Sequence, residues 1–169
     1  MRTRGSGPLR SVTAYDIDRN PTNLEAFVPT ARAALEQALV ARFGLHDGME
    51  AAAEAVAYGC EHWDRVRAMG NPVGYLYRVG EGRAKRRGTR RLREGLLVVE
   101  LSTTDSPVDV DLQRALARLT PPQRVAIVLV KAHGHTYGEA ARIMDLPVTA
   151  VTNHLTRGLA RLRLFMEER

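Results

Sequence analysis

The chain has a single cysteine, few aromatic residues and no long apolar run. Its one cysteine, Cys60, excludes an intrachain disulfide and gives no sign of an oxidising compartment. Phe, Trp and Tyr make up only 5% of the 169 residues, so the core must be built mainly from Leu, Val and Ala, which favours helices over sheets. No stretch approaches the roughly 20 apolar residues that cross a bilayer. We therefore expect a helical protein without a membrane span.

Sequence signatures of enzymes and cofactor sites are also missing. The chain has no P-loop, dinucleotide fingerprint, serine elbow or paired catalytic carboxylates, so we expect neither an enzyme nor a cofactor or small-molecule substrate. His133, His135 and His154 with Cys60 lack the ligand spacing of a closed zinc site, so we expect no metal. The basic, Gly-rich start lacks the apolar core of a signal peptide, and we expect a cytoplasmic protein.

Positive charge is in excess, and it is concentrated. The formal net charge is +6, and a strongly basic chain is typical of nucleic-acid-binding proteins, although a merely basic soluble protein has the same net charge. Residues 83–93, RAKRRGTRRLR, hold seven basic residues in eleven and no acid. This run would neutralise several DNA phosphates, and a basic linker would have the same composition. The placement of the cations is therefore more informative than their sum.

Apolar periodicity predicts helices along most of the chain. The predicted helices are Thr30–Phe43, Asp47–Met69, Pro72–Arg87, Asp111–Leu119, Pro121–His133, Thr136–Met144 and a last one from Pro147 or Val148 to the C-terminus. The buried stripe of the second is predicted to hold Met49, Ala52, Ala53, Val56, Cys60, Trp63 and Val66. Thr120–Gln123 and Thr136–Glu139 are expected to form capping boxes. Residues 1–22 have the composition of a mobile tail, and 96–99 are either a strand or a surface segment.

The segment His135–Arg163 has the spacing of a helix-turn-helix. A short helix with Ala140 and Ala141 is followed by the corner Asp145–Pro147 and then by a longer helix. In this motif one helix braces on the DNA backbone while the next enters the major groove by its N-terminal turns. A purely structural corner between two helices would share the pattern.

Four sequence blocks carry a family resemblance. They are Leu119–Arg124 (LTPPQR), Gly134–Ala141 (GHTYGEAA), Leu146–Val148 (LPV) and Arg157–Arg163 (RGLARLR). In order and spacing they resemble region 4 of a bacterial RNA polymerase sigma factor of the sigma-70 family, of the small two-domain extracytoplasmic-function type. The resemblance implies an all-α fold with two small helical domains joined by a linker.

A weaker resemblance extends to region 2 of the same family. Asp47–Val66 is similar to the long helix that binds core polymerase, and Asn71–Val79 (NPVGYLYRV) is similar to the start of the helix that reads the −10 element. The implied organisation is a flexible tail over 1–23, a region 2-like domain over 24–93, a linker over 94–108 and a region 4-like domain over 109–169.

The sequence departs from the family pattern in ways that matter. Only Glu50 and Glu54 stand where an acidic pair is usual, and Gly82 replaces a usual Asn. Ala150 replaces a usual Thr. The recognition helix offers Thr152, Asn153 and His154 where Lys, Ser and Arg are common. Fewer full charges would face the phosphates, which predicts weaker or more selective −35 binding.

The candidate site residues follow from helical spacing and from the resemblance. Asn pairs well with adenine, whereas Arg157 and Arg161 are better placed to hold phosphate. Tyr75 lies off the apolar side of its helix and could stack on melted DNA, while Trp63 is expected to pack in the core. The predicted DNA-binding residues are Val148, Thr149, Thr152, Asn153, His154, Arg157, Arg161, Tyr75, Arg78, Arg83, Lys85, Arg86 and Arg87. The predicted polymerase contacts are Glu50 and Glu54.

Three functional hypotheses follow from the sequence. The first is a sigma factor that binds core RNA polymerase and reads the −10 and −35 promoter elements; the resemblance also implies, in many cases, an anti-sigma partner. The second is a sigma-like DNA-binding regulator or antagonist without initiation activity, which Gly80, Glu81 and Gly82 in the −10 helix would suit. The third is an interaction module whose helix-turn-helix never meets DNA.

Overall fold

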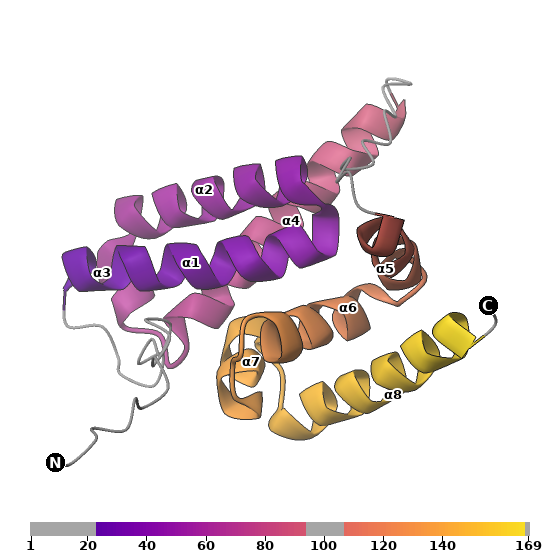
Figure 1. Ribbon diagram of the computed structural model, residues 1–169. Coiled ribbons are helices and arrows are strands. Elements are labelled where there is room, and N and C mark those ends of the chain that lie inside the picture. The colour runs from indigo at the N-terminus through magenta and orange to yellow at the C-terminus, as the bar shows by residue number, and fades with distance from the viewer. Residues whose placement is uncertain (1–22, 94–106, 168–169) are drawn as a thin grey trace, which may run out of the picture.

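The computed structural model describes residues 23–93 and 107–167, and Figure 1 shows them as a set of packed helices. No strand occurs in these two ranges, so the predicted all-α fold is confirmed. No helix within them is long and apolar enough to cross a membrane. The predicted tail over 1–22 and the apolar run over 96–99 lie outside the described residues.

The first helix, α1 (Leu24–Phe43), begins before the predicted start at Thr30 and passes through Pro29. Asn23 caps it, because its side-chain oxygen accepts the N–H of Ala26 at 2.8 Å. Phe27, near the start of the helix, packs against Trp63, and the centroids of the two rings lie 5.1 Å apart. The predicted start at Thr30 was therefore too late, because the cap and the aromatic contact stabilise the turn that precedes Pro29.

The predicted second helix is two helices, α2 (Leu45–Glu61) and α3 (Trp63–Arg67), which meet at His62. The predicted stripe was partly wrong, because Met49, Ala53 and Cys60 are exposed. The face of α2 that is buried consists of Gly48, Ala51, Ala52, Ala55, Val56 and Gly59. These residues are small, and this face is buried because small side chains let α2 lie close against α1 and α4.

Helix α4 (Pro72–Arg93) runs past the predicted end at Arg87 and continues through the basic run. Of the apolar residues expected to be buried on this helix, Val73, Leu76, Tyr77 and Ala84 are buried and Val79 is only half-buried. The glycines in its second half do not stop it, because helix α2 supports that stretch with ion pairs that are described below.

The C-terminal half contains the remaining helices. They are α5 (Pro107–Ala117), α6 (Pro121–Ile127), the π-helical turn η1 (Val128–Ala132), α7 (Tyr137–Met144) and α8 (Val148–Glu167). Both predicted capping boxes are present. Two predictions need correction. Helix α5 begins at Pro107, a residue suited to a first helical position, rather than at Asp111. The predicted helix to His133 changes to π geometry at Val128, which leaves Ala132 exposed.

One apolar cluster joins the two halves. It combines residues of α1, α2 and α4 with Val125, Leu129, Ile143 and Val151 from the C-terminal half, and α6 and α7 both contact α1. A smaller cluster of Leu119, Ile127 and Leu155 lies within the C-terminal half. The halves are thus packed on each other through a continuous core, an arrangement that the sequence did not reveal.

Two polar contacts accompany this packing. The guanidinium of Arg124 donates to the carbonyl oxygens of Ala41 at 2.6 Å and Arg42 at 3.1 Å, and so satisfies the C-terminal end of α1. His135 is 5% exposed, and its Nε2 lies 2.6 Å from Oε1 of Gln37 on α1. Each contact ties α1 to the segment around α6 and α7.

We predict that replacing Gly48 destabilises the fold. A Cβ there would lie 2.4 Å from Cα of Val40, whereas one at Gly82 would meet nothing within 4 Å. Gly48→Ala should lower the free energy of unfolding by about 1–3 kcal/mol. Gly82→Ala should raise it by up to about 1 kcal/mol, because alanine favours a helix. Urea unfolding followed by circular dichroism measures both, and equal effects of the two changes would contradict the packing.

We also predict that the free energy of unfolding decreases as the pH drops, because of His135. Burial lowers the pKa of its imidazole, while Glu139, 3.7 Å from Nδ1, acts in the opposite direction. The folded state therefore binds fewer protons than the unfolded chain as the pH drops below about 6.5, and stability present above that pH is lost. Urea unfolding at pH 7.5 and 5.5 should show a smaller loss in His135→Gln than in the original chain. The control His46→Gln, at an exposed position, should keep most of the loss.

Candidate nucleic-acid interface

Helices α7 and α8 meet at the corner predicted from the sequence. Ala140, Ala141, Ile143 and Met144 are buried as expected. Asp145 ends α7 in the left-handed conformation, with φ 53° and ψ 47°, and Val151 of α8 is fully buried beyond it. The capping box at the start of α7 is closed in both directions, with Glu139 N to Thr136 Oγ1 at 3.1 Å and Thr136 N to Glu139 Oε2 at 2.7 Å. A helix-turn-helix is therefore present.

One side of α8 faces away from the protein. Val151, Leu155 and Gly158 are buried on the inner side. The exposed positions between 147 and 164 are Pro147, Val148, Thr149, Asn153, Thr156, Arg157, Ala160, Arg161, Arg163 and Leu164. No acidic residue occurs between positions 148 and 166. Within the described part of the chain, Arg157 and Arg161 make no ion pair, so their charges are available to a polyanion.

The structure separates the predicted contacts on α8 into two groups. Thr149, Asn153, Arg157 and Arg161 share the exposed side, with Val148 at its start. Thr152 is half-buried and its Oγ1 donates to the carbonyl of Val148 at 2.9 Å, and His154 is also half-buried. Thr156 is exposed beside Arg157 and was left out of the predicted set, although its i+7 spacing from Thr149 would have identified it.

The predicted contacts at the start of α4 face other side chains of the protein. The Tyr75 hydroxyl lies 3.1 Å from that of Tyr58, and this hydrogen bond raises the pKa of Tyr75. Nε of Arg78 lies 2.6 Å from Oδ2 of Asp145, at the corner before α8, and this bond raises the pKa of Arg78. Helix α4 thus contacts the helix-turn-helix itself.

The basic residues further along α4 are mostly paired with acids. Arg87 lies 2.6 Å from Glu54 and 3.5 Å from Glu50, and Arg83 lies 3.7 Å from Glu54. Lys85 pairs with Glu81 one turn earlier. Arg86 is exposed. The two predicted polymerase contacts are therefore brought together with the cations of the basic run.

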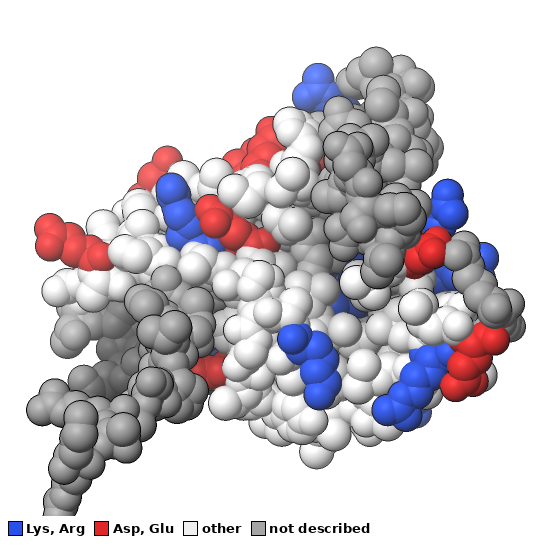
Figure 2. Space-filling model, in the orientation of Figure 1, with Lys and Arg blue, Asp and Glu red and all other residues white. Residues whose placement is uncertain are grey.

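Charge is unevenly spread over the surface. On the face shown in Figure 2, most acidic side chains lie over the N-terminal helices, and separate basic side chains lie over α6–α8. The described residues contain one group that could offer ligands to a cation, His46, Asp47 and Glu50 in the first turn of α2. Glu50 already faces Arg87, and His46 is exposed. This group is typical of an acidic surface.

Comparison with known proteins agrees with this geometry. Residues 109–162 match the family model "Sigma-70, region 4", which spans most of α5, all of α6, η1 and α7, and most of α8. The C-terminal half therefore carries a sigma-70 region 4, and the resemblance stated from the sequence for this segment is confirmed.

A solved structure extends the sigma-70 comparison to both halves. The sigma factor RpoE, solved in complex with the anti-sigma factor NepR from Bartonella quintana, has a similar fold, with a TM-score of 0.58 at 20% sequence identity. The match covers 83% of this chain and 91% of that chain. At this identity the match shows the fold, and the region 4 match identifies the C-terminal segment.

We predict that Glu54 supports α4 within this sigma-70 fold. Glu54→Gln should lower the free energy of unfolding by about 1 kcal/mol at low salt, because it removes the charge that Arg83 and Arg87 face, and the loss should shrink in 1 M NaCl. Glu61→Gln is the matched control, since Glu61 is exposed and has no partner among the described residues. Urea unfolding at the two salt concentrations tests this, and a loss of equal size in both variants would contradict it.

Proposed function

We propose that this protein is a transcription initiation factor that binds core RNA polymerase and reads the −10 and −35 elements of promoters. The observation that carries the proposal is the outer side of α8, which is exposed, free of acids and lined with groups suited to DNA. It follows a buried, capped helix α7, as a helix-turn-helix requires.

In this proposal α8 reads the −35 element. Asn153 supplies the amide that pairs with adenine, and Thr149 and Thr156 flank it on the exposed side. Arg157 and Arg161 hold the phosphates. With only Arg157, Arg161 and Arg163 as cationic side chains on the exposed side of α8, binding by this domain alone is expected to be weak, so the remaining affinity must come from polymerase and from the other half.

The N-terminal half docks on polymerase and engages the −10 element in this proposal. Helix α2 leaves Met49, Ala53 and Cys60 on its outer side, and Leu45 at its start is 61% exposed. A surface patch of this kind suits a protein partner. Arg86 is the exposed member of the basic set on α4, and Tyr75, Arg78, Arg83, Lys85 and Arg87 become available to DNA once their internal partners release them.

The related structure suggests a further partner. RpoE was solved with the anti-sigma factor NepR, and we propose that an anti-sigma factor also controls this protein. The proposed site of action is the cytoplasm. The domain boundaries in this proposal are 24–93 and 109–169, joined by a linker.

The test is reconstitution with core RNA polymerase. The complex should start transcripts on a subset of genomic DNA fragments that share an upstream element, and the protein should co-purify with core polymerase. Asn153→Ala should reduce initiation about tenfold on those fragments, since a good amide–adenine pair is worth about 1–3 kcal/mol. Arg67→Ala is the control, because Arg67 lies in a surface ion pair with Asp64 away from α8.

The outcomes separate the proposal from its alternatives. Failure to associate with core polymerase, or initiation that is independent of fragment sequence, would contradict it. Association without initiation would favour the sigma-like regulator. One feature supports that second candidate: Glu81 is fixed by Arg42 at 2.9 Å and by Lys85, so the unusual acid in the −10 helix is built into the fold.

A further inference from the structure

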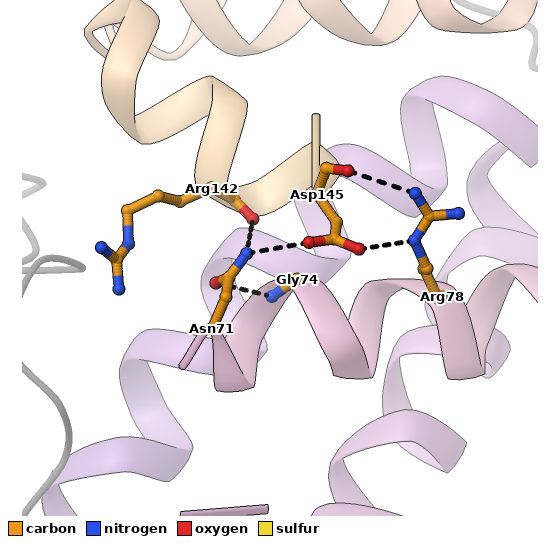
Figure 3. Close-up of polar contacts among 5 residues, drawn as sticks. All are labelled: Asn71, Gly74, Arg78, Arg142 and Asp145. Atoms are coloured by element: carbon orange, nitrogen blue, oxygen red, sulfur yellow. Dashed lines mark hydrogen bonds and ion pairs between the residues drawn. The ribbon is translucent and has the colours of Figure 1, made fainter. Parts of the chain in front are cut away.

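The start of α4 is bonded to the corner of the helix-turn-helix through a compact polar network (Figure 3). Nδ2 of Asn71 donates to the carbonyl oxygen of Arg142 at 2.9 Å and to Oδ1 of Asp145 at 3.3 Å. Arg78 donates from Nε to Oδ2 of Asp145 at 2.6 Å and from a terminal nitrogen to the Asp145 carbonyl at 3.1 Å. Asp145 therefore receives three hydrogen bonds from the other half of the protein.

Backbone geometry on both sides is adapted to this contact. A Cβ at Gly74 would lie 2.7 Å from the carbonyl oxygen of Arg142, so only glycine lets α4 approach α7 this closely. Oδ1 of Asn71 accepts the N–H of Gly74 at 3.2 Å, which orients the amide for its bonds across the interface. Asp145 is the one non-glycine residue with positive φ in the described ranges, a conformation that glycine adopts more easily.

These observations point to a role for Asp145 beyond the corner itself. Glycine would suit the corner conformation better, but it would supply no carboxylate to Arg78 and Asn71. The same Arg78 belongs to the basic set that the proposed function assigns to DNA. Two of the three nitrogens of its guanidinium are bonded to Asp145 in this geometry, and its charge is paired with that carboxylate, so it is less available to a phosphate.

The position of α4 sets a second condition. In the structure the start of α4 touches the corner that precedes α8. This contact holds the two proposed DNA-reading helices next to each other, whereas the proposed function assigns them to two separate promoter elements.

We propose that Asp145, with Arg78 and Asn71, is a latch that keeps the two halves closed and α4 away from DNA until polymerase and promoter separate them. The promoter part of this proposal rests on the proposed function. The latch itself is a property of the free protein and can be measured without DNA or polymerase.

The experiment measures opening by thiol labelling. Ala34 is 2% exposed and lies on the side of α1 that carries Gln37 and Ala41, whose polar atoms contact the C-terminal half. In a Cys60→Ser background, an Ala34→Cys thiol should react slowly with Ellman's reagent. Ala55→Cys is the matched reporter, because Ala55 is fully buried between α2 and α4 within the N-terminal half.

The latch predicts a specific pattern of rates. Asp145→Asn keeps a side chain that tolerates the left-handed conformation but loses the charge, and it should speed labelling at position 34 about fivefold, the effect expected for a partly exposed ion pair. Arg78→Ala should act similarly, and the double variant should add nothing more, because both remove one interaction. Arg67→Ala should change nothing, and labelling at position 55 should be unaffected in every variant.

Other results overturn the latch. Unchanged labelling at position 34 in Asp145→Asn, or effects of the two single changes that multiply in the double variant, would contradict it. Equal acceleration at positions 34 and 55 would show loss of stability instead and would also contradict it. Bound to core polymerase and promoter DNA, the original chain should label at position 34 faster than the free protein does. Failure to bind polymerase would overturn the proposed function, while the difference in the free protein would still support the latch.

Discussion

The packing of α1 against both halves is the constraint on which the rest of the structure depends. Small residues along α2, chiefly Gly48, Ala51 and Ala55, allow a close N-terminal bundle. The same α1 helix then contacts α6 and α7 through a continuous apolar cluster. Because interiors are close-packed, moving either group of helices changes the surroundings of the other. The relative position of α4 and α8 is therefore set by the core and not only by surface charges.

The charges are distributed in a way that suits this closed arrangement. On α4, Arg78, Arg83, Lys85 and Arg87 are each held by an acid of the same chain. On α8, the exposed arginines have no such partner within the described ranges. In the free protein the outer side of α8 thus keeps cations that are unpaired in the described part of the chain, while most of the basic run is neutralised. In the proposed function, α8 is therefore more accessible to DNA than α4 before polymerase binds.

The helix-turn-helix was predictable because its determinants are local. Capping boxes, the small pair Ala140 and Ala141, and the spacing to Val151 act within a few residues and define both helices and the corner. The buried side of α2 could not be predicted in this way. Met49 and Cys60 are more apolar than Gly48 and Gly59, but the neighbouring helices approach so closely that only the small residues fit between them. Likewise, the ion pairs of Glu54 and the contact of Asp145 with Arg78 join residues far apart in sequence.

The most direct test of the central claim is to locate α8 on DNA in a reconstituted initiation complex. A photoactivatable crosslinker on a cysteine at position 149, in a Cys60→Ser background, should react with duplex DNA about 35 base pairs upstream of the start site, because the proposed function places α8 in the major groove of the −35 element. The same crosslinker on Cys60, on the outer side of α2, should react with polymerase instead. Crosslinks from position 149 to protein alone, with none to upstream DNA, would contradict the proposal that the exposed side of α8 reads the promoter.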